Sequence, residues 1–502
     1  MYAWRLTLTM IDSRCHCSSM CRDLLVQPPA PVREHIRFHD AIPGQPSPLE
    51  PPAGLAARLG IFDATMVVMG GIVGSGIFIN SYVVAKLVHT PAMILGAWVA
   101  GGLLALVGAF IYAELANRMP EVGGQYAYIR EAYDPLLGFL YGWVSILVIH
   151  AGGTAAVAVT FGKYFREFSH SAVPENVAAV SVVVALTAIN CLGVRAGSGV
   201  QSFFMVLRVL AIVMIVGCGA WFLLRSSVAP HPAWQPLLDR PASFDLLTVF
   251  GAALIPVIFA YGGWQTSNYI ASEIREPRTN LPKALLLGVI GVIALYVSVN
   301  LVYVQALSPV GLAATSTPAS AVMRAALGEA GAKLVAITIA ISTLGFLSQA
   351  MLTYPRVAFA MAEDGVLPRA FARLGSRSRV PVAAIILQGA ITSAAVMLGT
   401  FEQLLSYVVV MDWLFFGLTA SCLFIFRRRQ ARKGNPPGAT RGFRVPGHPW
   451  TTGLFVLVAW LIVLNTIYKY PRNAGVAVCI LLAGVPVYYL LRGRVKRTAG
   501  SQ

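Results

Sequence analysis

Residues 70–78 read GGIVGSGIF, and residues 259–264 read FAYGGW. Both stretches lie inside long apolar blocks, where an unbroken helix would be the simplest structure. Glycine in a helix interior costs about 1 kcal/mol relative to alanine, so each cluster weakens the helix that contains it. The two clusters therefore predict two apolar helices that are broken partway along their length. Close helix packing is the alternative use of such glycines.

The composition places these helices in a membrane. Of the 502 residues, 57% are hydrophobic and 12% are charged, whereas soluble domains have about 25% charged residues. A soluble protein of this composition would expose large apolar patches to water. The apolar residues form blocks of the length that a bilayer-spanning helix needs, about 20 residues. Barrel strands would instead alternate over about 10 residues, so the chain is predicted to be an all-α integral membrane protein.

The apolar blocks also predict the order of the helices. A rough count finds twelve transmembrane blocks, and the two glycine clusters fall in the first and the sixth. Broken helices 1 and 6 indicate a five-plus-five inverted repeat with a site near the bilayer midplane. The blocks are centred near residues 73, 103, 148, 185, 213, 258, 296, 345, 390, 414, 460 and 483.

Three regions follow from this pattern. Residues 1–55 are polar, Pro-rich and aperiodic, which is typical of a disordered tail. Residues 56–427 form the predicted core of helices 1–10, with the two repeats at about 59–225 and 245–427. Residues 428–502 hold a basic loop, helices 11 and 12 and a short C-terminal tail.

The net charge of +17 predicts the orientation in the membrane. With a cytoplasmic N-terminus, the connections after even-numbered helices carry most of the Arg and Lys residues, including the cluster at 427–432. The positive-inside rule then places both termini in the cytoplasm of a multi-pass cell-membrane protein. Nucleic-acid binding is rejected because no basic stretch is interleaved with aromatic residues.

No metal site, cofactor or catalytic set is expected. The seven cysteines do not form a disulfide framework, and Cys15, Cys17 and Cys21 are irregularly spaced for metal binding. The histidines are scattered, and neither a Ser/His/Asp set nor a phosphate-binding loop occurs. The sequence therefore does not predict an enzyme.

The broken helices indicate what the core binds. Where helix 1 restarts after residues 74–76, its first amides lack intrahelical partners and carry the positive end of the helix dipole, which suits a carboxylate. Where helix 6 stops at residues 259–261, free carbonyl groups suit an ammonium. A site with both features fits a zwitterionic α-amino acid.

Several short motifs occur in a specific order. They are GSGIF at 74–78, YAEL at 112–115, GGQYAY at 123–128, NC at 190–191, FAYGGW at 259–264, PRTNLP at 277–282, PR at 355–356 and DGVLP at 364–368. In these motifs and their spacing the chain resembles the amino acid–polyamine–organocation superfamily, and within it the L-type amino acid transporters and their bacterial relatives. The resemblance covers about Leu59 to Phe426 and, more weakly, the last two helices.

The resemblance implies a secondary transporter that works by alternating access. It implies that the substrate carboxylate is held by the amides of Gly74, Ser75 and Gly76. The carbonyls expected to hold the amine are those of Ile72, Phe259, Ala260 and Gly262. The Phe259 ring is expected to act as a gate over the substrate, with an ordinary core or lipid-facing ring as the alternative.

Three residues depart from the family pattern. Arg208 stands where relatives commonly carry a lysine that is thought to hold the broken helix 1 and, in some members, to couple transport to protons. A guanidinium keeps its charge and is a poor proton carrier, which predicts exchange or facilitated transport. The alternative is that Arg208 only faces a polar crevice.

Asp412 stands where relatives tend to have asparagine, and His150 where they have arginine. A carboxylate at membrane depth usually has a partner or a function, so Asp412 could bind a cationic substrate group, offset the charge of Arg208 or lie near a helix end. His150 could titrate near neutral pH or be a hydrogen-bonded structural residue.

The substrate side chain is expected to meet a pocket that helix position and family analogy assign to Ile146, Gly153, Ser342, Phe346, Asp412 and Trp413. Neutral L-amino acids are the predicted substrates, because Gly262 and Gly263 leave the amine site without the extra carboxylate of some members. Cationic amino acids or polyamines, and proton-coupled symport, are the alternatives.

A sensor or a channel would need a signalling extension or a filter loop, and neither is visible. Animal L-type transporters use a cysteine between helices 3 and 4 to join a heavy chain. Residues 163–175 contain no cysteine, so no disulfide-linked partner is expected.

Overall fold

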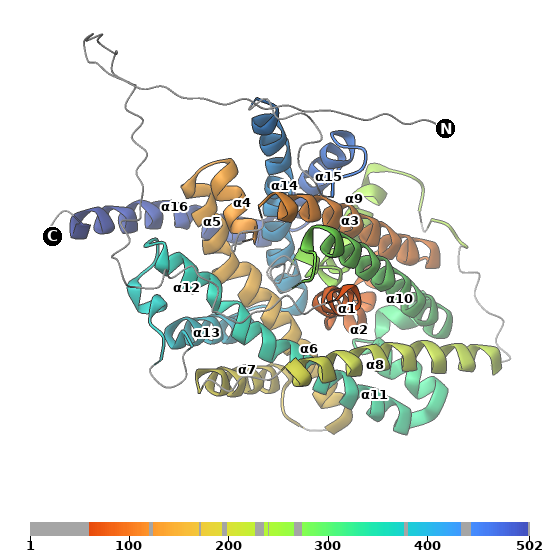
Figure 1. Cartoon of the computed structure of the whole chain (residues 1–502). Coiled ribbons are helices and arrows are strands. Elements are labelled where there is room, and N and C mark those ends of the chain that lie inside the picture. Colours follow the sequence, from red (N-terminus) through yellow and green to blue (C-terminus); the bar gives the residue numbers. More distant parts are fainter. Residues whose placement is uncertain are drawn as a thin grey trace, which may run out of the picture. The chain divides into compact units, whose positions relative to one another are not determined.

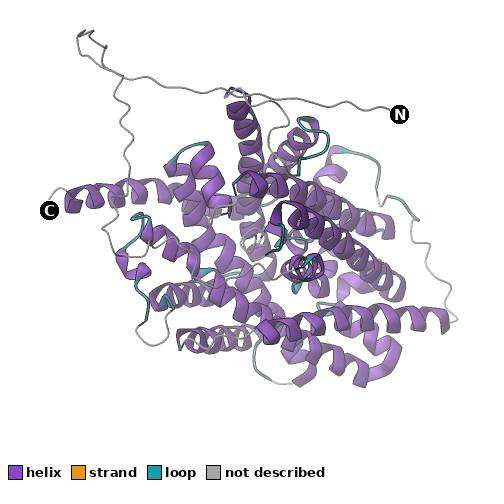
Figure 2. Cartoon of the chain, in the orientation of Figure 1, coloured by secondary structure: helices purple, strands orange, loops and turns teal. Residues whose placement is uncertain are grey.

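The computed structural model describes residues 60–119, 124–169, 172–192, 198–225, 235–238, 240–265, 274–375, 380–432 and 443–499. Among these residues the chain forms helices joined by short loops and no β-strand (Figure 2). The predicted all-helical architecture is thus confirmed for this part of the chain. The predicted tail with its cysteines, and most of the basic loop after Arg432, lie outside the described residues.

The helices follow one another closely along the chain. Their bounds are α1 (Ile61–Ile72), α2 (Gly76–Leu87), α3 (Pro91–Arg118), α4 (Gly124–Ala132), α5 (Pro135–Val144), the π-helical turn η1 (Ser145–His150), α6 (Ala151–Ser169), α7 (Glu175–Cys191), α8 (Ser198–Arg225), α9 (Phe244–Ala260), α10 (Pro277–Ala314), α11 (Pro318–Thr353), α12 (Pro355–Glu363), the 3-10 turn η3 (Arg369–Ala372), α13 (Val382–Leu398), α14 (Phe401–Arg432), α15 (Trp450–Lys469) and α16 (Pro471–Ala499).

Eight of the described helical segments are long and apolar enough to cross a membrane. The pair α1 and α2 passes the same test as one broken span, with a bend of 41°. Three further helices, α7, α9 and α13, are apolar but shorter. The described residues therefore hold eight or nine membrane-capable helices, and the count of twelve stays a prediction.

Helix starts follow the local chemistry of capping. Thr90 precedes Pro91 at the start of α3, and its hydroxyl accepts the amide of Met93 at 3.2 Å. Asp134 precedes Pro135 at the start of α5, and its carboxylate accepts the amide of Leu136 at 2.6 Å. Proline suits the first helical position because its missing N–H would lack a partner there, and the cap satisfies another free amide.

The broken pair α1 and α2 lies among the other helices (Figure 1). α1 packs on α10, and α2 packs on α9, α10 and α11. Polar contacts fix α2 within these apolar surroundings, where an unpartnered polar group would be costly. The Ser81 hydroxyl donates to the Asn300 side-chain oxygen of α10 at 2.7 Å, and the Asn80 amide donates to the carbonyl of Pro256 in α9 at 2.6 Å.

The span from α5 to α6 contains a π-helical turn that hydropathy did not predict. α5 passes through η1 into α6 without a gap. Such turns are rare and often mark functional sites. The ring of His150, the last residue of η1, stacks on Tyr354 with 4.1 Å between ring centroids, at the junction of α11 and α12.

At each end of α14, a carboxylate makes hydrogen bonds that connect this helix to its neighbours. Buried Glu114 of α3 accepts hydrogen bonds from Arg427 of α14 at 2.6 Å, from Arg118 at 2.8 Å and from the amide of Val445 at 2.7 Å. At the opposite end of α14, Glu402 accepts the hydroxyl of Tyr82 of α2 at 2.9 Å. These bonds connect α14 to α3 and the segment before α15 at one end, and to the broken pair at the other.

Candidate functional site

The break between α1 and α2 leaves a short non-helical backbone. α1 ends at Ile72 and α2 begins at Gly76. The amide of Gly74 donates to the carbonyl of Ile72 at 2.7 Å, so this one of the three expected carboxylate-binding amides already has a partner. Ser75 is the N-cap of α2, but its side chain makes no capping bond. The first amides of α2 therefore lack a side-chain cap and form the positive end of a helix.

The end of α9 lies directly against the break between α1 and α2. α9 ends at Ala260, and the turn that follows is closed by the amide of Gly262, which donates to the carbonyl of Phe259 at 3.1 Å. A Cβ atom on Gly76 would lie 2.7 Å from the Cβ of Ala260. Gly263 has a φ of +104°, and a Cβ there would overlap the carbonyl oxygen of Gly71. The two glycine clusters therefore bring two helix ends and one helix start into backbone contact.

Tyr296 of α10 joins the two helix ends. Its buried hydroxyl lies 3.2 Å from the carbonyl oxygen of Ile72 and 3.3 Å from that of Ala260. A hydroxyl has one hydrogen and donates to one acceptor at a time, so it is shared between the two carbonyls. Both carbonyls are among those expected to hold the substrate amine. Sequence reasoning missed Tyr296, because a single tyrosine in the seventh apolar block indicates no partner.

Arg208 of α8 holds the end of α1. Its Nη1 atom donates to the carbonyls of Gly70 at 3.1 Å and Val73 at 3.2 Å. Its Nε atom donates to the Ser342 hydroxyl of α11 at 3.2 Å, and the guanidinium lies 5.8 Å from the centroid of the Phe346 ring. The side chain is buried and makes no ion pair with any described carboxylate. The guanidinium instead lies at the C-terminal end of α1, which is the negative end of the helix dipole.

Two expected pocket residues, Ser342 and Phe346, thus contact Arg208. Gly153 of α6 faces open space, since a Cβ atom there would meet nothing within 4 Å. Ile146 is buried in the π-helical turn. Trp413 packs on Phe416 and on Phe455 of α15, at centroid distances of 5.9 Å and 5.8 Å. It is joined to the α9 break through Phe416, which packs on Trp264 at 5.1 Å.

The other departures from the family pattern have different surroundings. Asp412 makes no ion pair with any residue in the described ranges, Arg208 included. The buried Nδ1 atom of half-buried His150 has no hydrogen-bond partner there, and the ring is stacked on Tyr354. No group of three or more metal-ligating side chains occurs in the part of the chain that the structure describes.

Apolar helices around a broken helix and a neighbouring helix end are typical of membrane transporters. The sequence agrees, since residues 59–489 match the amino acid permease family. The chain belongs to this family, which lies within the amino acid–polyamine–organocation superfamily.

Three relatives share most of their length with the chain. It is 29% identical over 445 residues to the large neutral amino acids transporter small subunit 2 of Mus musculus, covering 87% of this chain and 81% of the relative. It is 29% identical over 449 residues to the serine/threonine exchanger SteT of Bacillus subtilis, covering 88% and 98%. It is 28% identical over 470 residues to the Asc-type amino acid transporter 1 of Homo sapiens, covering 92% and 86%.

Proposed function

We propose that the chain carries neutral L-amino acids across the cell membrane by alternating access, in exchange for other amino acids. In this proposal the fold has twelve transmembrane helices with a five-plus-five inverted repeat. Both termini face the cytoplasm. Residues 1–55 form the disordered tail, and residues 428–502 hold the basic loop, helices 11 and 12 and the short C-terminal tail. The observation that carries the proposal is the meeting of two helix ends and one helix start at Ile72, Ala260 and Gly76.

The two ends of the substrate are bound by backbone groups of opposite polarity. The substrate carboxylate binds the amides of Ser75 and Gly76, at the positive end of the α2 dipole. It also binds that of Gly74 once this amide leaves the carbonyl of Ile72. The substrate ammonium binds the carbonyls of Ile72 and Ala260, together with those of Phe259 and Gly262. To do so it replaces the Tyr296 hydroxyl, which lies between two of these carbonyls in this structure. The Phe259 ring closes over the substrate.

The substrate side chain points toward Gly153, where the structure has open space, and toward Ile146, Ser342, Phe346 and Trp413. Neutral substrates agree with the relatives, of which one is named for large neutral amino acids and another for serine and threonine. A cationic side chain would need Asp412 within the pocket.

Arg208 and one of the relatives support exchange. A guanidinium that is bonded to Gly70 and Val73 holds α1 without releasing a proton. One relative is itself named an exchanger. The chain works without a disulfide-linked heavy chain, because the connection between α6 and α7 has no cysteine.

Proteoliposomes test this function directly. Purified protein is reconstituted with or without internal L-alanine, L-serine and L-leucine, and uptake of the radiolabelled amino acids is followed with and without a proton gradient. Uptake that needs internal amino acid and ignores the gradient is the expected result. Uptake into empty liposomes driven by the gradient contradicts the exchange mechanism, and transport of only arginine or polyamines contradicts the neutral substrate class.

A further inference from the structure

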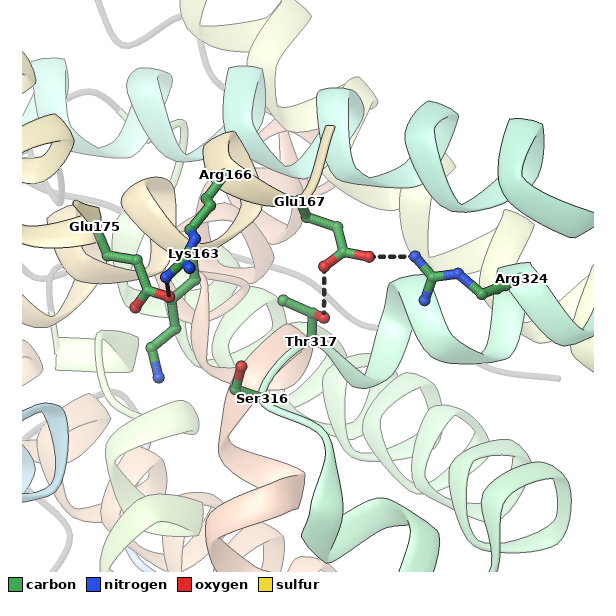
Figure 3. A pocket seen from close by; sticks show the side chains of 7 residues that line it. All are labelled: Lys163, Arg166, Glu167, Glu175, Ser316, Thr317 and Arg324. Atoms are coloured by element: carbon green, nitrogen blue, oxygen red, sulfur yellow. Dashed lines mark hydrogen bonds and ion pairs between the residues drawn. The ribbon is translucent and has the colours of Figure 1, made fainter. Parts of the chain in front are cut away.

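A cavity of about 510 Å³ lies at the end of α6 (Figure 3). Its walls come from the end of α6, the start of α7, the link between α10 and α11, and the first turns of α11. It shares no residue with the candidate substrate site. Seven residues line it: Lys163, Arg166, Glu167, Glu175, Ser316, Thr317 and Arg324.

Charges of both signs face this cavity. Arg324 pairs with Glu167, which also accepts the Thr317 hydroxyl at 3.3 Å, and Arg166 pairs with Glu175 at 3.5 Å (Figure 3). The lining has three cations and two carboxylates, and Arg324 also pairs with Glu329 outside the lining at 2.6 Å. Its volume lies within the range of about 300–1,000 Å³ that is usual for small-molecule sites.

Lys163 is the cation of the lining that forms no ion pair with another lining residue. It makes no ion pair with any residue that the structure describes. Its ammonium donates to the Tyr82 hydroxyl at 3.3 Å and lies 5.2 Å from the centroid of the Phe401 ring. The Tyr82 hydroxyl in turn donates to Glu402 at 2.9 Å. Lys163 therefore links the cavity to α2, the half-helix whose other end forms the carboxylate side of the substrate site.

We propose that this cavity is a second binding site for an amino acid, with Lys163 and Arg166 holding its carboxylate and Glu175 its ammonium. A simple anion would use only the cations and a polyamine only the carboxylates, whereas a zwitterion matches both signs. The proposal rests on the proposed function, because it takes the ligand class from the transported substrate. An ammonium has three donors, so Lys163 can bind the carboxylate while keeping its bond to Tyr82.

Equilibrium binding to the purified full-length protein tests this site. Radiolabelled L-serine and L-leucine are titrated in a scintillation proximity assay, and the number of molecules bound per chain is measured. We expect two per chain for the wild type. Lys163→Gln lowers the affinity of one of the two at least tenfold. Arg166→Gln does the same without touching the Tyr82 contact.

Lys86→Gln is the matched control. The Lys86 ammonium lies 4.6 Å from the Tyr82 ring centroid and 4.0 Å from Glu402, much as Lys163 lies beside Tyr82, but it does not line the cavity. It should keep two molecules per chain. Equal losses in both lysine variants would assign the effect to the Tyr82 contacts and overturn the cavity site.

The outcomes also separate this inference from the proposed function. One molecule per chain in a wild type that still exchanges amino acids in liposomes overturns the second site alone. A wild type that binds neither amino acid and exchanges none contradicts both.

Discussion

The backbone at Gly263 passes so close to Gly71 that a Cβ atom on Gly263 would overlap the carbonyl oxygen of Gly71. Gly263 also has a φ of +104°, a conformation that residues with a side chain rarely adopt. Two independent physical reasons therefore require glycine here. The contact fixes the distance between the ends of α1 and α9.

Gly263→Ala should therefore separate the two helix ends. The strain is of the order of 1–3 kcal/mol for the backbone alone, before the overlap is added. We expect a lower thermal unfolding midpoint and loss of amino acid exchange. Gly96→Ala is the control, because a Cβ on Gly96 in α3 would meet nothing within 4 Å. It should leave the unfolding midpoint unchanged or slightly raised, and an equal loss of exchange in both variants would contradict the argument.

Arg208→Lys tests whether the fixed charge prevents proton coupling. A buried lysine can change its protonation in the physiological range, whereas a guanidinium cannot. We expect the exchange rate of the variant to vary more between pH 5.5 and pH 8.5 than that of the wild type. Arg225→Lys changes an exposed arginine at the end of the same helix and should behave as wild type. An Arg208→Lys profile that is no steeper than the wild type would remove the support for this role.

Arg208 could be singled out from the sequence, whereas Tyr296 could not. The glycine clusters correctly place the break between α1 and α2 and the end of α9, because glycine weakens a helix wherever it lies. The family pattern likewise directs attention to Arg208. Tyr296 is 224 residues from Ile72, and nothing in its apolar neighbourhood marks one hydroxyl as shared between two helix ends.

The type of helix and the long-range ion pairs could not be predicted from the sequence either. The π-helical turn at Ser145–His150 has the apolar composition of the α-helices around it, so hydropathy does not distinguish it. The bond between Glu114 and Arg427 joins residues 313 apart. Local patterns predict helices, but which charges meet depends on how those helices pack.

Glu114→Gln should destabilise the protein strongly. The carboxylate is buried and holds both Arg118 and Arg427, so its loss leaves two cations without a counter-charge. Breaking a buried ion pair typically costs about 3–5 kcal/mol. We expect a marked fall of the thermal unfolding midpoint in detergent.

Glu131→Gln is the control for this change. Glu131 is 64% exposed and pairs with Arg429 at 3.8 Å, and exposed pairs contribute about 0–1 kcal/mol. Its unfolding midpoint should stay close to that of the wild type. Similar midpoints for the two variants would show that the Glu114 cluster does not hold the helices together.

Stability should fall as the pH drops below about 6.5, the ordinary pKa of histidine. Burial and the nearby Arg427 guanidinium lower the pKa of His448, which lies in the connection before α15. Below pH 6.5 the unfolded chain therefore binds a proton at this residue that the folded chain resists, and protonation favours unfolding. His448→Asn keeps a side chain that can bond Thr452 but cannot titrate. Between pH 7.5 and 5.5 its unfolding midpoint should fall less than that of the wild type, and identical slopes would contradict this role.

Tyr296→Phe should strengthen substrate binding. In the substrate-free protein the variant leaves the carbonyls of Ile72 and Ala260 without the hydroxyl that they share. A net hydrogen bond contributes about 0.5–1.5 kcal/mol, so the ammonium no longer has to displace it and the dissociation constant should fall by a factor of about 2–10. Exchange returns the carrier loaded and should keep most of its rate. Tyr303→Phe is the control, since this buried tyrosine on the same helix has no hydrogen-bond partner for its hydroxyl among the described residues. Binding that weakens in Tyr296→Phe would instead mean that the hydroxyl helps to hold the substrate.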